Sequence, residues 1–85
     1  MPKLYASKHI VRVLELHGFS FVSQKGSHMK YCKMEKGITT VVIVPANRKE
    51  IPFGTFHSIV RQSKLDKKIS KAKMRQIILL FIFHE

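Results

Sequence analysis

The residues of this chain with the clearest potential for chemistry are Gly26, Ser27 and His28. They lie between two segments whose composition predicts β-strands, so the glycine would allow a tight turn and the histidine would begin the second strand. An imidazole changes its protonation state near pH ~6.5, which lets it accept or donate a proton at the pH of a cell. Beside many cations, such a side chain suits an enzyme that acts on a polyanion.

The chain is strongly basic. It has 16 Lys and Arg but only 5 Asp and Glu among 85 residues, a net charge of +11. The basic residues are spread over both halves, which predicts a surface that attracts the phosphates of a nucleic acid; an acidic protein partner would suit the same surface. The residues expected to contact RNA phosphates are Lys25 and Lys30, which flank His28, together with Arg48 and Lys49 in a polar loop.

The densest run of positive charge allows three interpretations. It could be a solvated helix face, a track for phosphates or a contact for acidic side chains of a partner. The sequence leaves these open. The run comprises Lys64, Lys67, Lys68, Lys71, Lys73 and Arg75.

Cysteine and histidine usage predicts neither a disulfide nor a metal site. Cys32 is the only cysteine, and with scattered histidines it forms no zinc-binding pattern, so we expect no metal and no cofactor. The first residues lack the apolar stretch of a signal peptide, which predicts a cytoplasmic location. The apolar tract at 77–83 has seven residues, far fewer than the roughly 20 that span a bilayer, so no membrane association is expected.

Hydrophobic periodicity predicts a helix over residues 7–17 and another over 55–63. Ser7 is the expected N-cap of the first, and Thr55 of the second. We expect His17 at the boundary of the core and both His9 and His57 on solvated flanks. A basic segment over 67–75 follows, after which the apolar tract could form a helix or a strand.

Three segments predict strands, over residues 19–25, 28–36 and 38–44, with tight turns at Gly26-Ser27 and at Gly37. The order α-β-β-β-α predicts an α+β fold in which two helices cover one face of a three-stranded antiparallel sheet. This is the topology of the double-stranded RNA-binding domain (dsRBD). In the third strand both alternating sets are apolar, so the second face of the sheet would need another subunit, such as in a homodimer, or another partner.

Several short motifs then occur in a fixed order. They are His17-Gly18-Phe19, Gln24-Lys25-Gly26-Ser27-His28, Val44-Pro45 and Gly54-Thr55-Phe56-His57-Ser58-Ile59. In order and spacing they resemble the HicA family of toxins, whose members are small basic ribonucleases with a dsRBD-like fold. The resemblance covers about residues 3–69, and we expect a domain over 1–69 followed by an extension over 70–85.

The resemblance implies a cytoplasmic toxin that cleaves messenger RNA without the ribosome and is masked by a HicB-type antitoxin. It assigns the catalytic histidine to His28 and supporting positions to Gly26 and Ser27. The chain departs from the family at Asn47, where members often have histidine, and no family role extends to residues 70–85. The main alternative is a dsRBD-like module that binds RNA without cutting it, and a third is an interaction protein that pairs through its apolar surfaces.

Overall fold

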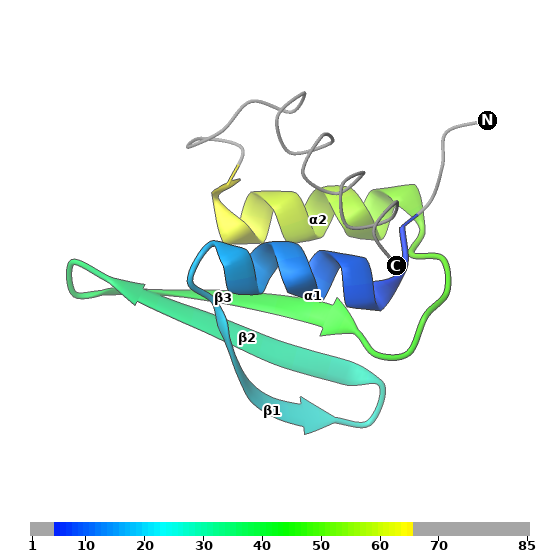
Figure 1. Ribbon diagram of the computed structural model, residues 1–85, viewed down its shortest axis with the longest axis horizontal. Helices are drawn as coiled ribbons and strands as arrows, with labels where there is room; N and C mark the ends of the chain where they lie inside the picture. Colours follow the sequence, from blue (N-terminus) through cyan, green and yellow to red (C-terminus); the bar gives the residue numbers. More distant parts are fainter. Residues whose placement is uncertain (1–4, 66–85) are drawn as a thin grey trace.

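The computed structural model describes residues 5–65, and the order of its elements confirms the predicted α+β fold. Two helices cover one face of a three-stranded antiparallel sheet whose strands lie in the order β1-β2-β3 (Figure 1). The elements are α1 (Ser7–Leu16), β1 (Ser20–Lys25), β2 (His28–Glu35), β3 (Ile38–Pro45) and α2 (Phe53–Ser63). The predicted basic segment and apolar tract lie outside the described residues.

Both hairpins of the sheet close through two-residue turns. Lys25 pairs with His28 across the first turn, where Gly26 has a φ of 58°. Lys36 and Gly37 form the second turn and have φ values of 52° and 77°. Positive φ at both central residues of this second turn is what a type I′ hairpin turn requires, and that turn type matches the twist of the flanking strands.

The pairing of β2 with β3 separates the two faces of the sheet. Met29 and Tyr31 lie opposite Val44 and Val42 on the face beneath the helices, where both valines are fully buried. Burial raises the pKa of the Tyr31 hydroxyl above its ordinary value, and the nearby Glu15 carboxylate raises it further.

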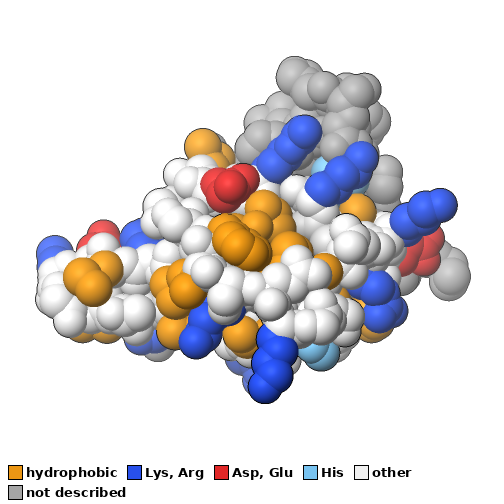
Figure 2. All heavy atoms as spheres, turned by 90° about the horizontal axis from the view of Figure 1, so that it is seen from below, with side chains coloured by type: hydrophobic (Ala, Val, Ile, Leu, Met, Phe, Trp, Pro, Cys, Tyr) orange, Lys and Arg blue, Asp and Glu red, His pale blue; other side chains and the backbone are white. Residues whose placement is uncertain are grey.

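Neither α1 nor α2 covers the other face of the sheet. His28, Lys30 and Cys32 lie there opposite Pro45, Ile43 and Val41. Val41 and Ile43 are 40% and 37% exposed, as expected for apolar residues on the outer face of the third strand. Figure 2 views the molecule from the side on which β1 lies and shows hydrophobic side chains in the middle of this view with Lys and Arg around them.

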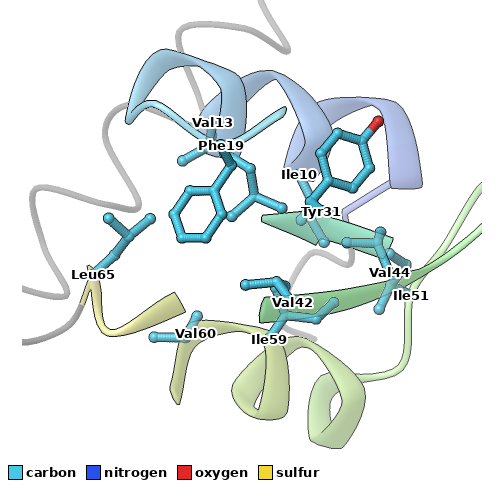
Figure 3. Packing of buried hydrophobic residues seen from close by; sticks show 11 residues of the cluster. Ile10, Val13, Phe19, Tyr31, Val42, Val44, Ile51, Ile59, Val60 and Leu65 are labelled. Carbon is cyan, nitrogen blue, oxygen red and sulfur yellow. The ribbon is translucent and has the colours of Figure 1, made fainter. Parts of the chain in front are cut away.

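The core forms where the apolar stripes of the helices meet the inner face of the sheet. Figure 3 shows side chains from α1, the strands and α2 converging on one cluster. Leu14 and Ile51 are each 1% exposed, and Leu65 closes the cluster beyond α2 at 2%. The buried apolar members are Ile10, Val13, Leu14, Phe19, Tyr31, Val42, Val44, Ile51, Ile59, Val60 and Leu65.

Three local predictions are wrong. The N-cap of α1 is Ala6, because the Ser7 hydroxyl is engaged by a distant loop rather than by its own helix. Helix α2 begins at Phe53, two residues before the predicted start at Thr55, and its N-cap is Pro52. The earlier start adds ring contacts of Phe53 with Phe56 and His57 to the first turn.

The third correction concerns His9, which was expected on a solvated flank. It is only 8% exposed, and its Nδ1 accepts a hydrogen bond from the Ala6 N–H at 3.4 Å. The expectations for the other two histidines are confirmed. His17 is half-buried at the end of α1, where its Nδ1–H donates to the Val13 carbonyl at 2.9 Å, and His57 is exposed.

Neither helix within residues 5–65 is long and apolar enough to cross a bilayer.

Two leucines of α1 provide a direct test of this packing. Leu14 is 1% exposed whereas Leu16 is 62% exposed. Leu14→Ala should lower the free energy of unfolding by about 2–5 kcal/mol, because it removes buried methyl groups and leaves a cavity. Leu16→Ala should change it by less than about 0.5 kcal/mol. Urea denaturation of both variants would measure this, and equal losses would contradict the packing described.

Candidate active site

His28 opens onto a groove of about 430 Å³ between the edge of the sheet and α2. The sheet side of the groove is formed by the first hairpin turn and the end of β3, and the other side by one face of α2. The lining residues are Ser27, His28, Ile43, Pro45, Ala46, Arg48, Pro52, Thr55, Ser58, Ile59 and Gln62.

Two hydrogen bonds hold the turn that precedes His28. The Ala46 N–H donates to the Ser27 carbonyl at 2.7 Å, which fixes the turn against the residue after β3. The Gln24 side-chain amide donates to the Gly26 carbonyl at 2.9 Å, which braces the turn from β1. His28 itself is exposed, so its imidazole is accessible to a large substrate.

An irregularity in β1 brings Lys25 to the face of the sheet that carries His28. Phe21 pairs with Tyr31, on the helix side, and simple alternation would place Lys25 on that side too. The register shifts between Phe21 and Ser23, and Lys25 pairs directly with His28. A β-bulge re-aims the side chains that follow it, so this one places a cation beside the histidine.

A short segment before and at the start of α1 holds the loop that forms one wall of the groove. The Ser7 hydroxyl donates to the Pro45 carbonyl at 2.6 Å and accepts from the Arg48 N–H at 3.0 Å. The Ser7 N–H donates to the Arg48 carbonyl at 2.9 Å, and the Ile51 N–H donates to the Tyr5 carbonyl at 2.7 Å. We call residues 5–7 the N-terminal clamp, because these four bonds fix the course of the chain from Pro45 to Ile51.

Helix α2 is joined to the edge of the sheet by one side chain. The Gln62 Oε1 accepts a hydrogen bond from the Ile43 N–H at 3.0 Å. Within residues 5–65 β3 is an edge strand, so this bond satisfies a backbone donor that no described strand pairs with. It also fixes the distance between the two walls of the groove.

The residues predicted for the site are partly brought together. Ser27, His28 and Arg48 line the groove, and Gly26 forms the turn beside it. Lys25 and Lys30 lie on the same face of the sheet as His28, Lys30 opposite Ile43. Lys49 is exposed in the loop but does not line the groove.

Helix α2 supplies polar lining residues that the sequence did not predict. Thr55, Ser58 and Gln62 lie on one side of the helix at the spacing i, i+3 and i+7. This polar stripe runs beside the apolar one, and its spacing is the signal that could have revealed it. Asn47, the position at which the sequence departs from the resemblance, adopts a φ of 56°, a left-handed conformation that asparagine tolerates well.

Comparison with known families gives one match over most of the chain. A family model described as HicA toxin of bacterial toxin–antitoxin systems matches residues 7–65. This range extends from the start of α1 to the last described residue and includes every groove residue. No curated protein matches the chain. Within residues 5–65 no three His, Cys, Asp or Glu side chains are grouped so that they could hold a metal ion.

The N-terminal clamp can be tested through Ser7, which is 4% exposed. Ser7→Ala should lower the free energy of unfolding by about 1–3 kcal/mol, because it leaves the Pro45 carbonyl and the Arg48 N–H without their hydroxyl partner. The Arg48 amide should also exchange its hydrogen faster. Ser23→Ala, in an exposed position of β1, is the matched control. If the two variants unfold alike and protect Arg48 alike, the clamp does not hold the loop.

Proposed function

Because the chain belongs to the HicA toxin family of bacterial toxin–antitoxin systems, we propose that it is an endoribonuclease that cleaves messenger RNA, with His28 as its proton-transfer residue. The observation that supports this most directly is the groove that both the exposed His28 and Arg48 line. The proposal needs no metal, because RNA contains its own nucleophile in the 2′-hydroxyl next to each phosphate.

In the proposed reaction the His28 imidazole accepts the proton of a 2′-hydroxyl. The 2′-oxygen forms a bond to the adjacent phosphorus, and the bond from phosphorus to the 5′-oxygen breaks. The leaving 5′-oxygen takes a proton from the imidazolium or from water, so the products are a 2′,3′-cyclic phosphate and a 5′-hydroxyl. Of the residues that line the groove, His28 is the one with an imidazole, the side chain that enzymes use most often for proton transfer.

The charge that develops on phosphorus needs fixed cations nearby. Arg48 is suited to this role, because a guanidinium stays charged and can donate two parallel hydrogen bonds to phosphate oxygens. The N-terminal clamp holds its backbone on both sides, through its N–H and its carbonyl. Lys25 and Lys30 add positive charge on the same face of the sheet, where they would attract the neighbouring phosphates of the strand.

The partner that would control this activity is a HicB-type antitoxin in the cytoplasm. A net charge of +11 favours an acidic partner. An antitoxin that placed acidic side chains against Arg48 and covered His28 would exclude RNA from the groove. The exposed apolar residues on the outer face of the sheet, Val41 and Ile43, adjoin the groove and would be buried by the same partner or by a second copy of the chain.

The second candidate function is RNA binding without cleavage, which the α-β-β-β-α order favours. Binding to a duplex usually relies on a basic cluster at the start of the last helix of this fold. Here the first turn of α2 has Phe53, Gly54 and Thr55 instead. Salt-sensitive binding from which intact RNA is recovered would favour this function over cleavage.

His28→Ala should lower the rate of RNA cleavage by about 100- to 10,000-fold, the usual contribution of a positioned acid or base. The assay would follow purified protein and RNA in the presence of EDTA. His57→Ala is the matched control, since His57 is exposed on α2 and does not line the groove. Equal cleavage by wild type and His28→Ala, or cleavage by neither wild type nor variant, would contradict the proposal.

Two adjacent cations of the loop provide a second test. Arg48 lines the groove and Lys49 does not, although both are exposed. Arg48→Gln should lower kcat/KM for RNA by about 100-fold, as expected when one donor to a developing negative charge is lost. Lys49→Gln should have a much smaller effect, although it removes the same charge. Similar losses in the two variants would show that only the overall charge matters.

A further inference from the structure

A second groove, of about 300 Å³, lies at the other end of α2 and has no part in the proposed reaction. It is formed by the β2–β3 hairpin and the last residues of the helix. Its polar lining residues are Lys33, Glu35, Lys36, Thr40, Ser63 and Lys64. Three lysines and one glutamate give this second groove a net charge of +2, so it favours an anion.

The lysines of the second groove differ in their surroundings. The Lys33 Nζ lies 3.6 Å from the Glu35 Oε2 and 5.8 Å from the centre of the Phe19 ring. Glu35 therefore offsets the charge of Lys33. The net positive charge of the second groove comes from Lys36 and Lys64, both of which are exposed.

Both of these lysines occupy left-handed backbone positions. The φ of Lys36 is 52° and that of Lys64 is 61°. Glycine or asparagine is preferred in each place, at the first residue of a type I′ turn and just after a helix. Within residues 5–65 the remaining non-glycine residue with positive φ is Asn47, which follows that preference. Two lysines at one groove in a conformation that costs free energy indicate a use for their side chains.

The second groove follows the first along α2, but it opens on the helix side of the sheet, where Thr40 pairs with Lys33, whereas Ile43 lies on the face of His28. Gln62 lines the first groove and the next residue of α2, Ser63, lines the second, while β3 contributes Ile43 to the first and Thr40 to the second. From Ser58 to Lys64 the helix rises about 9 Å. From Pro45, which pairs with His28, to Thr40 the strand extends about 17 Å. The second groove thus begins beside the end of the first, and a strand that reaches both passes the edge formed by β3.

We propose that the second groove binds backbone phosphates of the RNA strand whose scissile phosphate lies at His28. This inference rests on the proposed function and extends it to a substrate that must occupy both ends of α2. RNA fits better than an acidic protein segment because an RNA strand has a phosphate at every nucleotide. A strand placed at His28 and led along this edge therefore brings phosphates to Lys36 and Lys64.

The test combines Lys36→Asn and Lys64→Gly, substitutions that remove charge but suit the left-handed backbone. The midpoint of thermal unfolding should stay the same or rise, which separates lost binding from lost folding. The affinity for single-stranded RNA would be measured at several salt concentrations in a His28→Ala background, where the RNA stays intact. The slope of log K against log salt should become shallower by about 1.4, since each phosphate contact to a single strand contributes about 0.7.

Two control variants accompany this one. Lys36→Arg with Lys64→Arg keeps the charge and should keep the salt slope. Lys8→Gln removes a charge from the exposed side of α1 and should also keep it. In the active protein, the ratio of kcat/KM for an oligonucleotide to that for a dinucleotide should fall when Lys36 and Lys64 are replaced by Asn and Gly.

An unchanged salt slope and an unchanged ratio, in a protein whose wild type cuts RNA, would overturn the second-groove proposal and leave the ribonuclease proposal standing. Weaker binding of polyglutamate with unchanged RNA binding would also overturn it, because it would assign the second groove to an acidic protein. A wild type that cuts no RNA would instead refute the proposed function. If Lys8→Gln lowered the RNA affinity and the salt slope as the double substitution does, the effect would come from overall charge alone, and the second-groove proposal would be overturned.

Discussion

The candidate site depends on four hydrogen bonds between the N-terminal clamp and the chain from Pro45 to Ile51. Without these bonds few contacts would hold the loop between β3 and α2, because exposed polar loops bury little apolar surface. The clamp uses backbone groups and one hydroxyl, so it sets the position of the Arg48 backbone rather than only its side chain. It also brings Ile51 into the core, where that residue is 1% exposed and anchors the approach to α2. The same stretch of chain is therefore tied both to the groove and to the core.

The groove lies at the edge of the sheet, where a backbone donor of β3 is satisfied by a side chain of α2. An edge strand offers unpaired backbone groups and open space on one side. The Gln62 hydrogen bond covers part of that edge. The groove beside it has β3 as its floor and α2 as its far wall. The cations around it come from separate elements: Lys25 from β1, Lys30 from β2 and Arg48 from the loop. A polyanionic strand would meet positive charge from several directions, as a nuclease that binds mainly the phosphate backbone requires.

Much of the fold follows from patterns within single segments, and these patterns are visible in the sequence. Periods of two and of 3.6 residues predicted the order of strands and helices, and glycines marked the turns, including the one that precedes His28.

What the sequence did not reveal depends on contacts between segments. The bulge that turns Lys25 toward the face of His28 is a property of strand pairing. The role of Ser7 requires a loop about forty residues away, and the burial of His9 depends on how α1 packs. The α2 face of the groove was missed because its hydroxyl and amide residues resemble an ordinary solvated stripe.

The central claim is that this edge groove breaks RNA through the 2′-hydroxyl, with His28 as the base. The most direct measurement is the chemical identity of the ends produced from a defined oligonucleotide in EDTA, determined by mass spectrometry. The account predicts a 2′,3′-cyclic phosphate and a 5′-hydroxyl, and no cleavage when the nucleotide at the cut carries a 2′-hydrogen instead of the hydroxyl. A 5′-phosphate product, or efficient cleavage of the 2′-deoxy substrate at the same position, would contradict it.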